Sequence, residues 1–262
     1  MRRYLRLYLQ FLQFSFSRAM EFRLDFFFRI LMDVIYYIVN IAFFKVLYAR
    51  TPMLAGWNER QTMLFVSIFL VIDAINMTVF SNNVWQMPTQ INNGSLDYYL
   101  TRPVSSLFFL SLREFAANSF VNLLMTMAIL VWALRLNMEL VTPLNLLFLV
   151  PLIANGVFLY YLLNMVFIIP VFWTHSGRGF ADLFHSFTRF LERPDRLFTG
   201  IMRLILTVVL PLSLIASFPA RLFIDGFETG LFLHLTLVTA CFAGFMTLFW
   251  RKGLASYSSA SS

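Results

Sequence analysis

The chain has 262 residues, of which 60% are hydrophobic and only 13% are Asp, Glu, Lys or Arg. Soluble domains carry about 25% charged residues, so this composition excludes an ordinary soluble enzyme or binding domain and favours membrane spans. The formal net charge of +7 comes largely from Arg beside apolar segments, which favours contact with membrane lipids over binding of nucleic acid. The single cysteine excludes an internal disulfide, and the sequence has no Cys/His cluster with metal-ligand spacing.

Residues 1–23 predict a helix that lies in the membrane interface. Polar side chains recur every three or four residues, with apolar and aromatic side chains between them; the polar ones are Arg3, Arg6, Gln10, Gln13, Ser17 and Glu21. Such a thin polar stripe is typical of an interfacial amphipathic helix. A signal peptide is the alternative, because Arg2 and Arg3 precede an apolar stretch, but no small-x-small cleavage site follows.

Six long apolar runs follow, at residues 30–49, 62–81, 108–134, 144–173, 201–218 and 230–250. A helix of about 20 apolar residues crosses a bilayer core, so each run is long enough to span it. We therefore expect an all-α polytopic membrane protein with one transmembrane domain over 1–262. Its expected parts are spans 1–2 in 30–81, spans 3–4 in 108–173 and spans 5–6 in 201–250.

The positive charges predict the orientation of these spans. Most of the 20 Lys and Arg residues lie on the side that holds both termini. Outside the spans, the other side has only Arg50, Arg60, Arg135 and Arg221. Because Lys and Arg are retained in the cytoplasm, we expect a multi-pass protein of the inner or plasma membrane with both termini cytoplasmic.

The two longer connections, 82–107 and 174–200, are therefore expected in the cytoplasm. In 174–200, apolar side chains recur at helical spacing, which predicts a second interfacial amphipathic helix that ends before Pro194. An extension of the fourth span is the alternative reading of this segment.

The most distinctive stretch is residues 91–103. Asn-Asn-Gly at 92–94 predicts a turn, and a short helix follows it until Arg102 and Pro103. Asp97 early in that helix suits the helix dipole. A short helix of mixed polarity is suited to docking a cytoplasmic protein, although an ordinary helix on the membrane surface explains the pattern as well.

The pattern Gly-x-Leu-Asp-x-x-Leu-x-Arg-Pro at 94–103, after the second apolar run, resembles the signature of ABC transporter permeases of the type 2 export class. It is most similar to the permeases usually encoded in pairs beside one ATPase. The N-terminal interfacial helix, six spans, cytoplasmic termini and the Pro211 to Pro219 stretch fit the same family, so the resemblance covers essentially the whole chain.

The resemblance implies a permease subunit that is not itself an enzyme and has no cofactor of its own. It implies two copies of a cytoplasmic ATP-binding subunit, which bind ATP and Mg, and a second permease in a hetero- or homodimer. It also implies that a helix at about 90–103 couples the permease to the ATPase. The coupling residues would be Gly94, Leu96, Asp97, Tyr99, Leu100, Arg102 and Pro103.

Polar residues inside the apolar runs are the second set of candidates, because polar side chains are costly in lipid. They are Asn40, Asp73, Asn76, Asn155 and Asn164. They would either line a substrate path or hold neighbouring helices together through hydrogen bonds, and the sequence leaves both roles open.

Two other functions have less support. A membrane-embedded, lipid-modifying enzyme needs convergent nucleophiles, acids or metal ligands, and the sequence has no Gly-x-Ser-x-Gly or His-x-x-x-His pattern. An ion-coupled transporter needs matched charged, broken helices in its two halves, and Asp73 has no counterpart in the second half. No Walker A pattern occurs, so ATP hydrolysis requires a separate chain.

Overall fold

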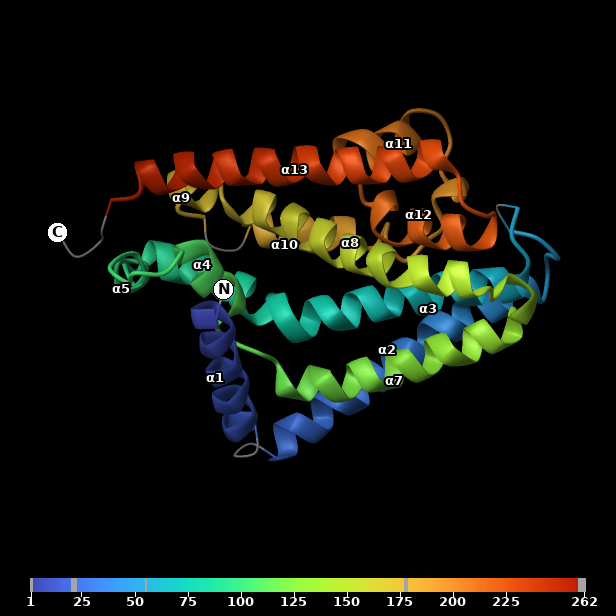
Figure 1. The fold of residues 1–262 in the computed structure, drawn as a ribbon, viewed down its shortest axis with the longest axis horizontal. Helices are drawn as coiled ribbons and strands as arrows, with labels where there is room; N and C mark the ends of the chain where they lie inside the picture. Colours follow the sequence, from blue (N-terminus) through green and yellow to red (C-terminus); the bar gives the residue numbers. More distant parts are fainter. Residues whose placement is uncertain (1, 20–22, 55, 177–178, 259–262) are drawn as a thin grey trace.

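The computed structural model describes residues 2–19, 23–54, 56–176 and 179–258, and its elements are helices (Figure 1). Within these ranges, five helices are long and apolar enough to cross a membrane, or six if one bent helix pair counts as a span. The predicted all-α, polytopic membrane fold is confirmed. The candidate spans are Phe26–Tyr48, Glu59–Asn92, Ser119–Leu136, Pro143–Thr174 and Thr229–Ser256.

The long helices run side by side along the molecule in Figure 1. They are α2 (Arg23–Tyr48), α3 (Glu59–Asn76), α7 (Ala117–Leu136), α8 (Pro143–Ile168) and α13 (Thr229–Ser256). We call the end with α1 (Arg2–Ala19) and the last turn of α13 the terminal end, and the end with the turns at 49–58, 137–142 and 225–228 the loop end. At the terminal end, α1 lies at a steep angle to the other helices (Figure 1).

Helix α3 is the centre of the bundle. Every residue from Thr62 to Ile72 is buried, and 72% of an apolar 18-residue stretch of its span is buried, compared with 17% of such a stretch in the α2 span. It packs against α2, α7, α8 and α12 (Ser213–Ile224). The outer helices leave apolar side chains for lipid or for protein neighbours.

Local sequence fixes where the central helices begin. Asn58 accepts a hydrogen bond from the backbone N–H of Gln61 at 2.9 Å, and the Gln61 side chain accepts one from the N–H of Asn58 at 3.0 Å. This reciprocal cap satisfies two amides at the start of α3. Thr142 caps α8 by accepting one hydrogen bond from the Asn145 N–H at 3.1 Å, and Pro143 occupies the first turn, where a missing N–H costs nothing.

The second apolar run extends further than its hydrophobicity suggested. Helix α3 continues through a π-helical turn, η1 (Met77–Ser81), into α4 (Asn82–Asn92). Residues 82–92, expected in a cytoplasmic connection, therefore prolong the second candidate span. The polar side chains of α4 concealed this because Asn83 is buried against protein instead of facing solvent.

The third apolar run is broken by four non-helical residues between α6 (Ser106–Leu112) and α7. The Asn83 side chain donates to the Glu114 carbonyl at 2.7 Å and accepts from the Glu114 N–H at 2.8 Å. The Ala116 N–H donates to the Thr78 carbonyl in the π-helical turn at 2.9 Å. Irregular backbone at membrane depth is stable only when protein groups satisfy it, and α4 and η1 do so here.

Residues 179–224 are arranged differently from the expectation of a cytoplasmic segment followed by a span at 201–218. Helix α10 (Gly179–Thr188) begins at the terminal end, where the His175 carbonyl accepts a hydrogen bond from Asn92 at 3.1 Å. By Arg196 the chain has reached the loop end, because this guanidinium lies 5.5 Å from the Trp57 ring and pairs with Asp225. The segment thus runs the length of the bundle.

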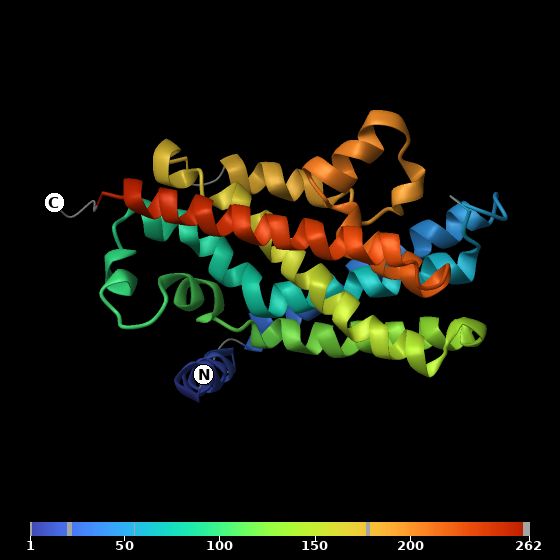
Figure 2. The ribbon, with the colours of Figure 1, turned by 45° about the horizontal axis from the view of Figure 1, so that its top comes forward.

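The next segment turns back on itself. The helical stretches Gly200–Val209 and Ser213–Ile224 are bent by 98° around the residues that include Pro211. Arg203 and Arg221 from the two arms lie 3.8 and 3.3 Å from the same buried Asp195 carboxylate. The two arms therefore meet again at Asp195, and Figure 2 shows the orange segment around residue 200 projecting beside α13.

The remaining short helices are α5 (Asp97–Leu100), η2 (Met138–Leu140), α9 (Val171–Thr174), η3 (Asp195–Leu197), α11 (Gly200–Leu204) and η4 (Ile205–Val209).

The charges of residues 189–203 suggested a cytoplasmic loop because unpaired Arg favours that side. Arg196 and Arg203 are instead paired with carboxylates of the protein.

This arrangement predicts which introduced cysteines share a side of the membrane. In a Cys241→Ser background, Thr199→Cys should react with an impermeant maleimide from the same side as Met138→Cys, and Thr174→Cys from the opposite side. All three positions are exposed. Labelling of Thr199→Cys together with Thr174→Cys would contradict the path of 179–198.

A second prediction concerns the contact of α8 with α12. A Cβ at Gly156 would lie 2.4 Å from the Ile215 carbonyl oxygen and 2.7 Å from Ile72 Cδ1, which forces the helices apart. Gly156→Ala should destabilise the purified protein by about 1–3 kcal/mol, measured as a lower Tm in detergent. Gly244→Ala is the control, because nothing lies within 4 Å of its added Cβ; an equal loss there would refute the explanation.

Candidate functional site

The segment 93–103 projects at the terminal end of the bundle, between α4 and α6 (Figure 1). Gly94 has a φ of +78°, a conformation that glycine adopts without strain. The Asn93 side chain accepts a hydrogen bond from the Ser95 N–H at 3.2 Å, which completes the predicted turn. Helix α5 follows directly, so the segment has the turn and short helix that its sequence indicates.

Two apolar residues anchor this segment. Leu96 is fully buried and Tyr99 is 6% exposed, in a cluster with residues of α4, α8 and α13. Arg113 donates a hydrogen bond to the Tyr99 hydroxyl, and its guanidinium lies 5.5 Å from the Tyr99 ring. Leu96 and Tyr99 therefore hold the segment in place and do not offer contacts to another protein.

The other side of the segment is open. Tyr98 is 56% exposed and Leu100 38% exposed, and Arg102 and Pro103 are also exposed. The Arg102 guanidinium stacks 4.3 Å from the Tyr98 ring centroid and donates to its hydroxyl. We call these four residues the docking patch: it joins a cation, an aromatic ring and an aliphatic side chain on a supported backbone.

Both ends of the chain pack near this segment. Tyr257, just after α13, lies close to Asp97; burial raises the pKa of the Tyr257 hydroxyl, and the Asp97 carboxylate raises it further. At α1, the Tyr4 hydroxyl accepts a hydrogen bond from the Ser105 N–H at 3.4 Å, and its ring meets Phe108 edge to face. Asp97 is thus half-buried against the protein's own C-terminal region.

The five intramembrane polar candidates do not form one site. Asn40 donates to the carbonyl of Tyr36 in its own helix at 3.1 Å, and Asn155 accepts from Thr239 at 3.1 Å, which joins α8 to α13. Asn76 is buried and Asn164 half-buried. Asp73 lines a cavity.

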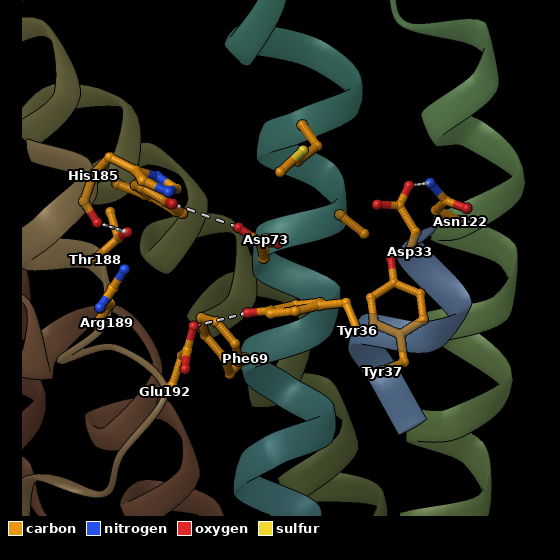
Figure 3. A pocket seen from close by; sticks show the side chains of 13 residues that line it. Asp33, Tyr36, Tyr37, Phe69, Asp73, Asn122, His185, Thr188, Arg189 and Glu192 are labelled. Carbon is orange, nitrogen blue, oxygen red and sulfur yellow. Dashed lines mark hydrogen bonds between the residues drawn. The ribbon is translucent and has the colours of Figure 1, made fainter. Parts of the chain in front are cut away.

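That cavity has a volume of about 400 Å³ and lies between α2, α3, α7, α8 and the α10 segment (Figure 3). We call it the polar cavity. It is lined by Asp33, Tyr36, Tyr37, Phe69, Asp73, Ala74, Met77, Asn122, Tyr160, His185, Thr188, Arg189 and Glu192.

Hydrogen bonds hold the three carboxylates of the polar cavity in place. Tyr160 donates to Asp73 across 3.5 Å, and Tyr36 donates to Glu192 at 3.0 Å. Asn122 donates to Asp33 (Figure 3). Each pair joins two different elements, so the carboxylates are positioned by the tertiary fold.

Sequence reasoning found Asp73 but not its neighbours. The four-residue spacing of Arg29 and Asp33 indicates only a local ion pair, and the charged residues around Glu192 indicate only a surface segment. The signal in the sequence is that Asp33 and Asp73 both interrupt apolar runs, and that Tyr36 and Tyr37 follow Asp33 within four residues. Among the described residues, no group of three His, Cys, Asp or Glu side chains is placed to hold a metal ion.

Comparison with known proteins decides the family. The family model of the ABC-2 family transporter proteins matches residues 34–261. The chain belongs to the ABC-2 transporter family. No curated protein and no solved structure gives a significant match. The predicted resemblance is confirmed, and the chain is the membrane subunit of an ABC-2 transporter, a family whose membrane subunit typically relies on a partner ATPase.

The buried residues that anchor segment 93–103 and the exposed residues of the docking patch should differ in their effect on the stability of the ABC-2 subunit. Leu96→Ala removes a fully buried side chain and should cost about 2–5 kcal/mol of stability, seen as a lower Tm of the purified protein. Leu100→Ala, at a side chain 38% exposed, should leave the Tm almost unchanged. The assignment fails if the two variants lose the same stability.

Proposed function

We propose that this ABC-2 subunit is the permease of an ATP-driven exporter and that its ATPase docks on segment 93–103. The observation that carries the proposal is the docking patch, in which exposed Tyr98, Leu100 and Arg102 stand on a backbone anchored by Leu96 and Tyr99. Exposed aromatic and Arg side chains are enriched at protein interfaces. A rigid base allows a partner to transmit force through them.

A continuous path leads from the docking patch into the bundle. The segment follows α4, and α4 continues α3 through the π-helical turn η1. A movement of the segment would therefore move the central helix, which packs against α2, α7, α8 and α12. Local π-helical turns often occur at functional sites, and η1 is the natural place for this helix to flex.

We further propose that both termini and the docking patch are cytoplasmic in the inner or plasma membrane. The excess of Lys and Arg in residues 1–29 and 251–252, together with Arg102 and Arg113, supports this orientation. The partner would be an ATP-binding subunit in two copies, and ATP and Mg would bind there.

A second permease would complete the translocation path, in a heterodimer or a homodimer. The α2 span supports this, because only 17% of it is buried within one subunit and its large apolar side chains face outward. The mass of the detergent-purified complex distinguishes the two assemblies, and a stable, active complex with a single permease would refute both.

Arg102→Ala is expected to weaken coupling. It removes a charged contact to the ATPase, which should weaken docking by about 1.5–3 kcal/mol, a loss of about tenfold or more in affinity. Transport-stimulated ATP hydrolysis of the reconstituted complex should fall, while expression and Tm stay normal because Arg102 is exposed.

Arg135→Ala is the matched control for this test, because Arg135 is exposed at the loop end. It should hydrolyse ATP at the wild-type rate. Normal coupling in a well-folded Arg102→Ala variant would show that the docking patch is only a surface loop.

A further inference from the structure

We propose that the polar cavity is a binding site for an amphipathic organic cation, a molecule with a protonated or quaternary nitrogen, or a comparable cationic centre, on an aromatic or aliphatic body. The transported molecule would bind in this cavity, so this proposal extends the proposed function and rests on it.

The size of the polar cavity suits a small organic ligand. Its volume of about 400 Å³ falls within the range of about 300–1,000 Å³ that is usual for such sites. Its walls come from α2, α3 with η1, α7, α8 and α10 with the residues after it. In Figure 3, Asp33 and Glu192 lie at opposite sides of the view with Asp73 between them, and the three come from α2, the segment after α10 and α3.

The charge of the lining favours a cation. Asp33, Asp73 and Glu192 are the three acidic residues that line the cavity, and Arg189 is the lining residue with a permanent positive charge. Arg29, one turn before Asp33, is close enough for its charge to act on Asp33.

If Arg29 is set against Asp33 and Arg189 against Glu192, no permanently charged cation of the lining remains for Asp73, and His185 is the one other basic side chain that lines the cavity. Its hydrogen bond in the cavity is a long one, 3.5 Å from the Tyr160 hydroxyl. An intramembrane carboxyl group is costly without a partner of opposite charge, so a cationic ligand would supply the missing positive charge beside Asp73.

The aromatic lining favours an organic cation over a metal ion. Rings of Tyr36, Tyr37, Tyr160 and Phe69 surround the carboxylates. Aromatic faces attract an organic cation and also cover its apolar body. A bare metal ion would need several oxygen ligands around one point, but the three carboxylates are each engaged by a different hydrogen-bond donor.

The first experiment measures binding to the purified full-length permease in nanodiscs. The probes are radiolabelled tetraphenylphosphonium and tetraphenylborate, which have nearly the same size and opposite charge; empty nanodiscs give the lipid background. We expect saturable binding of the cation with at least tenfold preference over the anion. Equal or preferential binding of the anion would overturn the proposal, as would the absence of saturable cation binding.

The second experiment places the cation in the cavity. Asp73→Asn and Glu192→Gln keep the side-chain volume and remove charge, and each should weaken tetraphenylphosphonium binding at least tenfold. Asp182→Asn is the control, because Asp182 is an exposed carboxylate on α10 outside the cavity, and it should bind as the wild type does. Unchanged affinity in both cavity variants, or the same loss in all three, would overturn the assignment.

The first experiment uses only the wild-type protein, so a variant that fails to fold does not affect its result. Failure here is also distinguishable from failure of the exporter proposal. A permease that activates its ATPase but ignores tetraphenylphosphonium would refute the cation site alone. Cation binding by a permease that has no partner ATPase would refute the exporter and leave the site.

Discussion

The structure depends on one constraint: α3 is enclosed by other helices in a region where water cannot satisfy polar groups. In hydrocarbon, an unpaired polar side chain or backbone group is costly, so each one on α3 must find a partner within the protein. Asp73 therefore faces a polar cavity between helices, and the Thr78 carbonyl in the π-helical turn accepts a hydrogen bond from the Ala116 N–H. The position of the cavity follows from the burial of this helix.

The same helix relates the two candidate sites. At the terminal end it continues into α4, whose Asn83 holds the break before α7 through two hydrogen bonds to Glu114. Further along, Asp73 and Phe69 form one wall of the polar cavity. A partner that pushes on the docking patch would act on both the break and the cavity wall. This connection is a physical path of packed and hydrogen-bonded groups.

Hydrophobic length predicted most of the fold, because crossing a bilayer leaves little choice of residue type. The charge count could not predict the ion pairs of Arg196 with Asp225 and of Arg203 with Asp195, because pairing depends on tertiary structure. The sequence also marked Leu96 and Leu100 alike, although one is fully buried and the other 38% exposed. In the cavity, Asp73 could be predicted as a polar residue within an apolar run. Glu192 could not, because it reaches the cavity only through the tertiary path of residues 179–198.

The central claim, that an ATPase docks on segment 93–103, is tested most directly by photocrosslinking in intact membranes. A benzophenone amino acid would replace Tyr98 in the docking patch and, as a control, exposed Met138 at the loop end. Our account predicts an adduct from position 98 with a protein that carries a Walker A ATPase domain, and none from position 138. Efficient crosslinking of position 98 to lipid alone, or of the ATPase to position 138, would contradict it.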